Sequence, residues 1–252
     1  MSLEVVVLGS SGTYPGPGRA CSSYLLRTDS ARVLVDCGNG SSANLLRHHD
    51  VVDLDAIVVT HAHPDHFADL VGMYYALRFH ATGQRRVDVF APPGLEARIT
   101  GLLADDGAAT FRDVCPVRDV SPGDVLAFGA LSLHLHHSRH SIATVSVRAE
   151  HDGATFVYSS DSAGGPELVA AARDADLFLC EATWLGQQEE WPDDVHLTAS
   201  QAGIIAREAG VARLALTHLW PANDREQARA QAQATFVGPV ELAEDGQVWM
   251  LS

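Results

Sequence analysis

The stretch Thr60-His61-Ala62-His63-Pro64-Asp65-His66 places three imidazoles and one carboxylate in a single short turn. An apolar run at 56–59 precedes it and predicts a short buried strand, and an amphipathic segment at about 67–81 follows it and predicts a helix. In so tight a turn, His61 and His63 can bind one cation while Asp65 and His66 face a second. Imidazole and carboxylate ligands suit zinc and related divalent ions, whereas structural zinc sites more often use several cysteines. The stretch therefore predicts a metal site at the C-terminal end of a strand.

Length and composition predict one globular domain covering residues 1–252. The chain is 46% hydrophobic and 19% charged, which is typical of a folded protein with one large core. No apolar run approaches the roughly 20 residues that span a bilayer, and the start lacks the basic head of a signal peptide. The four cysteines have no paired spacing and are expected as buried free thiols: Cys21, Cys37, Cys115 and Cys180. We therefore expect a cytoplasmic protein that makes no membrane contact.

The charge balance argues against a long nucleic acid as the partner. The formal net charge is −15, and all 17 basic residues are arginine. A protein that binds long nucleic acid usually shows a basic patch or stripe, and the sequence contains none. Bound metal cations would offset the acidic charge locally, so small phosphorylated substrates remain compatible with the composition.

Predicted strands and helices alternate along the rest of the chain, as in a layered α/β protein. A glycine- and proline-rich loop at 9–18 is either a plain connection or a backbone that approaches a ligand closely. The expected strands are 5–8, 22–26, 33–36, 56–59, 87–90, several within 125–148, 155–158, 177–180, 213–216 and two short closing ones. The expected helices start at 41 or 42 and cover about 67–81, 93–103, 199–209 and 225–234. The stretch from 104 to 120 is not assigned.

Further candidate ligands lie at the ends of later strands, where α/β sheets form their crevices. His140, Asp161 and His218 each follow an apolar run, so they can complete two cation sites with Asp161 in a bridging position. His196 opens a predicted helix and is the candidate proton donor. The alternative for His196 is a helix-start residue that faces solvent.

The remaining histidines are predicted not to be ligands, because they lie on surface helices, on one polar strand face or in a turn. His137 is the strongest rival to His140 among them. This group comprises His48, His49, His80, His134, His136, His137 and His151. Asp36, which ends a strand, either caps a turn or holds a ligand imidazole in place.

The motif His61-X-His63-X-Asp65-His66, with the later His140, Asp161 and His218, resembles the metallo-β-lactamase superfamily of dinuclear hydrolases. Three further motifs are similar to the branch that contains the tRNA 3′-processing endonucleases (RNase Z) and class II-type cyclic-nucleotide phosphodiesterases. They are Asp36-Cys37-Gly38-X-Gly40, Glu181-Ala182-Thr183 and His196-Leu197-Thr198-Ala199. The resemblance covers nearly the whole chain and implies an αββα four-layer sandwich. Relatives of this kind are often dimers, so a homodimer is a further expectation.

The resemblance also implies a distribution of ligands and roles. One metal would bind His61, His63 and His140, the other would bind Asp65, His66 and His218, and Asp161 would bridge them. Two divalent ions are expected, zinc by default, with manganese or iron as alternatives. A hydroxide shared by the metals would attack the substrate. Asp65 and His196 would be catalytic, with His196 protonating the leaving alkoxide, and Glu181 is a candidate for orienting His196.

Departures from the pattern narrow the expected substrate. Only 20 residues separate His140 from Asp161, where RNase Z enzymes usually insert a long arm that grips tRNA, and Asn39 replaces the RNase Z glutamate. Asp161 stands where β-lactamases of this fold often carry cysteine, which disfavours β-lactam hydrolysis. We therefore expect a phosphodiesterase acting on a small diester such as a cyclic nucleotide. The alternatives are an RNase Z-like endonuclease without the arm, a lactone or thioester hydrolase, and a metal-binding protein without activity.

Overall fold

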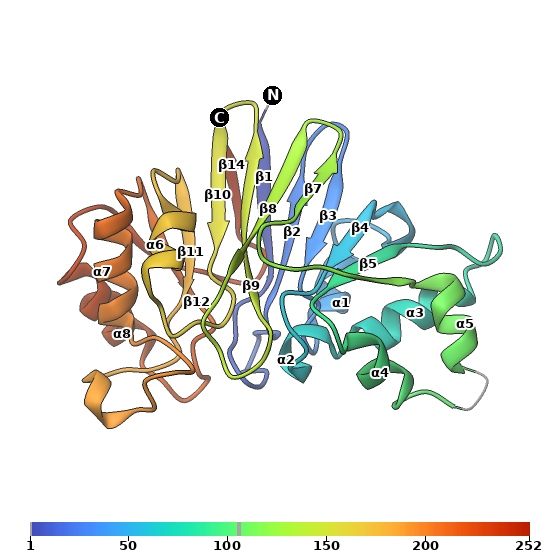
Figure 1. Cartoon of the computed structure of the whole chain (residues 1–252), viewed down its shortest axis with the longest axis horizontal. Coiled ribbons are helices and arrows are strands. Elements are labelled where there is room, and N and C mark those ends of the chain that lie inside the picture. Colours follow the sequence, from blue (N-terminus) through green and yellow to red (C-terminus); the bar gives the residue numbers. More distant parts are fainter. Residues whose placement is uncertain (1, 105–106) are drawn as a thin grey trace.

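The computed structural model describes residues 2–104 and 107–252, which form two seven-stranded sheets packed face to face. Helices cover the outer face of each sheet, so the layers run helix, sheet, sheet, helix (Figure 1). The strand order is β14-β1-β2-β3-β4-β5-β6 in one sheet and β13-β12-β11-β10-β9-β8-β7 in the other. This is the predicted αββα sandwich, and the two halves of the chain contribute one sheet each apart from β14.

The first sheet is antiparallel from β14 through β1 and β2 to β3 and parallel from β3 to β6. Its strands are β1 (Leu3–Gly9), β2 (Ser23–Arg27), β3 (Arg32–Val35), β4 (Ala56–Val58), β5 (Asp88–Ala91), β6 (Val117–Asp119) and β14 (Val248–Leu251). Its helices are α1 (Ser41–Leu45), η1 (Val51–Asp53), α2 (Pro64–Phe67), α3 (Leu70–Arg78), α4 (Leu95–Thr100) and α5 (Gly107–Val114). The parallel strands all end at the same edge, which is where the histidine turn begins after β4.

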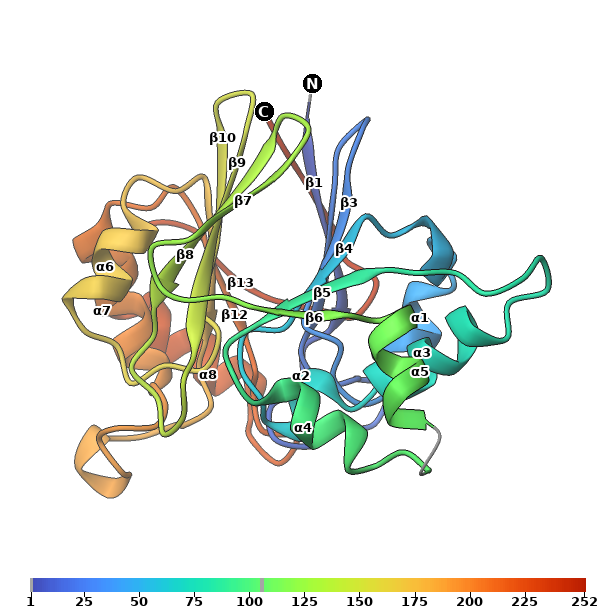
Figure 2. The same ribbon diagram turned by 45° about the vertical axis from the view of Figure 1, so that its right-hand side comes forward.

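The second sheet is antiparallel from β7 to β10 and parallel from β10 to β13. Its strands are β7 (Val125–Phe128), β8 (Leu131–His137), β9 (Val145–His151), β10 (Ala154–Tyr158), β11 (Leu177–Glu181), β12 (Leu214–Thr217) and β13 (Val240–Leu242). Its helices are α6 (Pro166–Ala172), η2 (Gln188–Glu190), α7 (Ala199–Ala209) and α8 (Arg225–Gln233). Figure 2 shows α6, α7 and α8 on the far side of this sheet from α1–α5.

The central core lies between the sheets and consists of the inward side chains of both. Leu131, Leu133 and Leu135 of β8 point into it, as the alternation of the sequence predicts, and they meet residues such as Val5 and Phe156. Two further apolar clusters lie under the helices on the outer faces. The buried sheets form a rigid base for the loops at the strand ends, which carry the histidines and aspartates.

The helix predicted at 67–81 is two helices, and this prediction was wrong in its boundaries. The first turn, α2, already begins at Pro64, and α3 begins at Leu70. Between them the backbone N–H of Asp69 donates to the carbonyl of Cys37 at 3.0 Å, and the Asp69 carboxylate accepts from the N–H of Ser42 at 2.7 Å. These bonds to the loop after β3 replace the helical bonds of Asp69, so the helix breaks there.

Other boundaries differ because short elements carry weak signals. The helix expected from Pro93 begins at Leu95, after Gly94 in the left-handed region (φ 106°). The unassigned stretch 104–120 contains α5 and β6, although 105–106 lie outside the described residues. Helix α6 was not predicted, because it follows Gly165 and has no side-chain cap that would signal its start.

The last features of the fold are the state of the cysteines and the length and polarity of the helices. All four cysteines are buried and carry free thiols, as predicted. Among the helices that the structure describes, none is long and apolar enough to cross a membrane.

Candidate metal centre

The candidate centre forms where the ends of strands from both sheets meet. The loop after β4 carries the histidine turn, the loop after β10 carries Asp161, and His218 directly follows β12. His140 comes from the connection between β8 and β9. These loops lie at the end of the sandwich marked by α2 in Figure 1, away from the two chain termini.

The first group of potential ligands contains His61, His63, His140 and Asp161, whose ligand atoms all lie within 4.8 Å of one another. Nδ1 of His63 is 3.1 Å from Nε2 of His61 and 3.2 Å from Nε2 of His140. Oδ2 of Asp161 is 3.5 Å from Nε2 of His61. Three ring nitrogens and one carboxylate oxygen thus converge on a common point.

The second group contains Asp65, His66, His218 and again Asp161. Nε2 of His218 lies 3.1 Å from Oδ2 of Asp65 and 3.3 Å from Oδ1 of Asp161, and Nε2 of His66 lies 3.1 Å from the same Oδ1. The two oxygens of Asp161 therefore face different groups, as a bridging carboxylate requires. The structure brings together all seven residues predicted as ligands and divides them as expected; that they bind metal stays a prediction.

The chemistry of these groups fits divalent cations. Burial lowers the pKa of His61 to about 3 and also lowers the pKa values of His63 and His140, so these imidazoles are neutral, which is the form that binds metal. His140 Nδ1 lies 2.8 Å from the carbonyl of Val195, which leaves the lone pair on Nε2 directed at the group. In the described part of the chain, the buried Oδ1 of Asp161 has no hydrogen-bond partner. Cations would provide the partners that these lone pairs lack.

The second group has a different charge balance, because it contains two carboxylates. Burial lowers the pKa of His66, but Asp161, Asp36 and Asp65 outweigh this effect and hold the pKa well above its usual value. Burial raises the pKa of Asp65, but His66 and His218 outweigh it, so this carboxyl has a lowered pKa and is ionised. Without a cation, a proton on His66 supplies part of the positive charge that the two carboxylates require, and a cation bound to Nε2 would replace this proton.

Asp36 holds His66 in place and does not merely cap a turn. Its Oδ2 lies 2.7 Å from Nδ1 of His66, and it also accepts hydrogen bonds from the Thr60 hydroxyl at 2.9 Å and the Tyr158 hydroxyl at 3.1 Å. Its Oδ1 accepts from the Thr60 N–H at 2.7 Å. With Nδ1–H directed at Asp36, Nε2 of His66 faces the site as a ligand would.

His218 is held by Thr183, which belongs to the motif Glu181-Ala182-Thr183 and had no predicted role of its own. The Thr183 hydroxyl donates to Oε2 of Glu181 at 2.7 Å and lies 2.8 Å from Nδ1 of His218. Because the hydroxyl proton is used on Glu181, the hydroxyl accepts from Nδ1–H, and Nε2 of His218 is left with its lone pair toward the site. A threonine two residues after a buried glutamate at a strand end is a weak signal that sequence alone does not decode.

His196 lies beside the second group and is paired with Glu181. Its Nδ1 is 2.9 Å from Oε1 of Glu181, and these two residues form a third cluster with His218. Burial lowers the pKa of His196, but the Glu181 carboxylate outweighs burial, and the pKa rises to about 9. The side chain of His196 is 14% exposed, so the alternative of a solvent-facing residue is wrong. It precedes α7, whose cap is Thr198.

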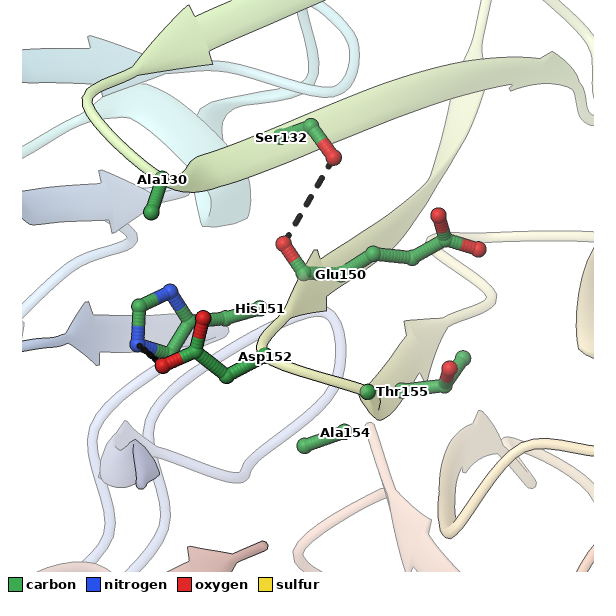
Figure 3. A pocket seen from close by; sticks show the side chains of 8 residues that line it. Ala130, Ser132, Glu150, His151, Asp152, Ala154 and Thr155 are labelled. Carbon is green, nitrogen blue, oxygen red and sulfur yellow. Dashed lines mark hydrogen bonds and ion pairs between the residues drawn. The ribbon is translucent and has the colours of Figure 1, made fainter. Parts of the chain in front are cut away.

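Every other histidine lies outside the three clusters of potential ligands found among the described residues. The strongest rival, His137, is exposed at the end of β8. His151 is buried at the turn between β9 and β10, where it lines a separate pocket of about 430 Å³ with Ser132, Glu150 and Thr155 (Figure 3). Its Nε2 is 3.7 Å from Oδ2 of Asp152. These positions agree with the prediction that the seven residues are not ligands of the centre.

The comparison with protein families places this centre in a known group. The family model of the beta-lactamase superfamily domain matches residues 31–219, which include all seven predicted ligand positions. The chain belongs to the metallo-β-lactamase superfamily. It is a metallo-hydrolase of the β-lactamase fold with a candidate metal-binding His/Asp cluster.

Similar proteins cover nearly the whole chain. An uncharacterized protein of Mycobacterium leprae is 32% identical over 99% of this chain and 89% of the relative. The probable metallo-hydrolase YhfI of Bacillus subtilis is 28% identical over 98% of this chain and 99% of the relative. A crystal structure of YhfI superposes with a TM-score of 0.87, 25% identity and 99% coverage of both chains. A ribonuclease Z of Haloarcula marismortui is 27% identical over 98% of this chain and 96% of the relative.

Proposed function

We propose that the protein is a phosphodiesterase that uses two divalent ions, zinc by default, to hydrolyse a small diester such as a cyclic nucleotide. The observation that supports this most directly is the His196–Glu181 pair, which lies beside two ligand groups that share Asp161. Hydrolysis of an alkyl phosphodiester needs a nucleophile at phosphorus and a proton for the alkoxide that leaves. Two ligand groups plus one separate acid are the parts that this reaction requires.

Each of the two ligand groups combines residues from the loops of both sheets. One ion would be held by His61, His63 and His140. The other would be held by Asp65, His66 and His218, and Asp161 would bind both ions. When bound, such ions supply an activated water nucleophile and offset the charge that develops on the phosphoryl oxygens. Asp36 and Thr183 fix the ligand imidazoles of His66 and His218 with Nε2 directed inward.

Asp65 and His196 act on the substrate side of the centre in this proposal. His196 keeps one proton on Nδ1, directed at Glu181, and donates the other from Nε2 to the leaving alkoxide. A pKa raised to about 9 keeps the imidazole protonated near neutral pH, as a general acid must be. Asp65, whose Oδ2 accepts from the N–H of Thr13 at 2.9 Å, would orient the attacking water.

The chain between His140 and Asp161 supports a small substrate. It consists of a short loop and the β9–β10 hairpin, which turns at Asp152-Gly153. The alignment with the ribonuclease Z relative spans 300 positions, and this chain has 252 residues, so at least 48 positions have no counterpart here. The net charge of −15 further weakens binding of a long polyanion.

The test is a side-by-side assay of the zinc-loaded protein with cyclic AMP, bis(p-nitrophenyl) phosphate, a tRNA precursor and a simple lactone. We expect turnover of the two small diesters and none of the other two substrates. His61→Ala should abolish turnover, whereas the matched control His80→Ala, which removes an imidazole outside the clusters, should retain it. Preferred cleavage of the tRNA precursor would favour the RNase Z alternative, and preferred cleavage of the lactone would overturn phosphodiester chemistry.

A further inference from the structure

His63, Asp65 and His196 are partly exposed members of the metal centre, and they mark where a substrate can reach it. The side chains of His61, His66 and His140 are fully buried, and those of His218 and Asp161 are 1–2% exposed. By contrast, the side chains of Asp65 and His196 are 13% and 14% exposed. A substrate whose phosphoryl group reaches the centre therefore has the rest of its atoms at the opening that these two residues and His63 border.

Tryptophans flank the His196 side of this opening. The ring of Trp184 packs edge-on against His196, with ring centroids 5.3 Å apart, and Trp191 stacks on Trp184 at 5.3 Å with an interplanar angle of 11°. Trp191 in turn meets the ring of Trp220 edge-to-face at 5.8 Å. Two indoles from the connection between β11 and α7 and one from the loop after β12 thus form one continuous aromatic cluster beside the proposed general acid.

The same cluster reaches the Asp65 side of the opening. Nε1 of Trp220 donates to the hydroxyl of Thr13 at 2.7 Å, and the backbone N–H of Thr13 donates to Oδ2 of Asp65 at 2.9 Å. Contacts therefore run without a break from His196 through the three indoles and Thr13 to Asp65. The aromatic cluster therefore borders the opening of the centre between Asp65 and His196.

Two of the indoles have accessible ring surface, and their N–H groups are already hydrogen-bonded within the protein. Trp184 is 4% exposed and serves as a wall, whereas Trp191 and Trp220 are half-buried. The N–H of Trp191 is used on the carbonyl of Leu185 at 2.7 Å, and that of Trp220 on Thr13. These hydrogen bonds fix the orientation of both rings. The accessible ring faces are therefore rigid apolar π surfaces, on which a planar ring of a ligand can stack.

We infer that Trp191 and Trp220 form a platform for the heterocyclic base of a nucleotide whose phosphoryl group lies at the metal centre. This inference rests on the proposed function, and it adds that the protein recognises the base of the substrate. Stacking on an aromatic side chain is available to every base, because every base has a π face. The platform therefore selects nucleotides over other small phosphoesters and discriminates weakly among the four bases.

The surroundings of the platform limit the ligand to a mononucleotide. The loop that carries Trp191 also carries four exposed carboxylates, and no arginine lies between 174 and 206. Those carboxylates belong to Glu189, Glu190, Asp193 and Asp194. The Arg139 guanidinium, which donates to the carbonyl of Asp193 at 3.0 Å, is outnumbered by these four carboxylates, so a polynucleotide would bring further phosphates past a loop with an excess of negative charge.

The test compares two ligands that share a phosphate but differ in the base, adenosine 5′-monophosphate and ribose 5-phosphate, by calorimetry on the zinc-loaded protein. We expect the first to bind about 10-fold more tightly, as one stacked base contributes. Trp220→Leu should bring the two dissociation constants together, through a larger loss of affinity for adenosine 5′-monophosphate than for ribose 5-phosphate. Some loss for both ligands is expected, because the Trp220 N–H also holds Thr13 beside Asp65. Trp220→Phe should keep most of the difference between the two ligands. The control Phe79→Leu removes an exposed aromatic ring at the end of α3 and should change neither.

Other outcomes separate this inference from its alternatives. Equal binding of the two ligands by the unaltered protein, or an equal loss for both in Trp220→Leu, would overturn the platform. Tighter binding of a short oligoadenylate than of the monophosphate would overturn the limit to mononucleotides. If bis(p-nitrophenyl) phosphate is hydrolysed and base discrimination is absent, only the platform fails. If no diester is hydrolysed and Trp220-dependent discrimination is present, the platform stands and the phosphodiesterase proposal fails.

Discussion

Oδ2 of Asp36 lies 2.7 Å from Nδ1 of His66, although 30 positions separate the two residues, and both side chains are fully buried. Asp36 has a φ of 58°, in the left-handed region that a non-glycine residue adopts at a cost. The loop after β3 is thus held in an unfavourable backbone conformation in which its carboxylate meets the histidine turn. The same carboxylate accepts two bonds from Thr60, so one side chain fixes the start and the end of that turn.

Replacing Asp36 should weaken metal binding without removing a ligand. In Asp36→Asn an amide N–H₂ would face either the N–H of Thr60 or the N–H of His66, and neither arrangement satisfies both donors. We expect zinc affinity to fall by about 10–100-fold, as for other partners of ligand imidazoles, measured by competition with a chromogenic chelator. The matched control is Asp176→Asn, which changes a carboxylate that accepts from the N–H of Thr155. Equal affinities of Asp36→Asn and the unaltered protein would show that Asp36 only closes the turn.

Two glycines test how tightly the loops pack around the centre. A Cβ on Gly38 would lie 2.0 Å from the carbonyl oxygen of Asp65 and 2.6 Å from Cβ of Cys21, so the backbone that carries Asp65 must move. Gly38→Ala should therefore lower both the melting temperature and the zinc affinity. In Gly72→Ala the new Cβ meets nothing within 4 Å, and this helical position should gain about 0.5–1 kcal/mol of stability. Thermal unfolding with and without zinc measures both effects, and an unperturbed Gly38→Ala protein would contradict the packing argument.

The side chains of the candidate centre were predictable because each carries a local signal. His140, Asp161 and His218 each follow an apolar run, and the ends of strands in layered α/β proteins meet at common edges. The histidine turn after β4 could be assigned for the same reason. Apolar alternation likewise located β8, because Leu131, Leu133 and Leu135 face the core between the sheets.

The details that the sequence did not reveal depend on contacts between distant segments. The break between α2 and α3 depends on the bond from the Asp69 N–H to the Cys37 carbonyl, and no local preference encodes it. The role of Thr183 depends on the position of His218, 35 residues later. Gly12 belongs to the glycine-rich loop for which the sequence left open a plain connection or a close approach to a ligand. It packs against His218, where a Cβ would lie 2.3 Å from the carbonyl oxygen.

Removing the metal ions should destabilise the folded protein. The two ligand groups bring neutral imidazoles and a shared carboxylate into buried contact, and cations that bind only the folded state add stability. At a free zinc concentration of about 100 times the dissociation constant, this contribution is about 2.7 kcal/mol per site. We expect a chelator to lower the melting temperature and zinc to restore it. Asp161→Ala should lose most of the zinc-dependent shift, and an unchanged shift would overturn the bridging role of Asp161.

The role of His196 can be separated from metal binding by the choice of leaving group. The alkoxide of a cyclic nucleotide needs a proton to leave, whereas p-nitrophenolate leaves without one, so a general acid matters only for the first. His196→Ala should slow cyclic AMP hydrolysis by about 10²–10⁴-fold and affect bis(p-nitrophenyl) phosphate far less, with the zinc content unchanged. Glu181→Gln should show the same selectivity more weakly, because Oε1 of Glu181 raises the pKa of His196 to about 9 and holds its Nδ1. The ratio of kcat for the two substrates is the measurement, and equal losses on both would mean that His196 positions the substrate and does not donate the proton.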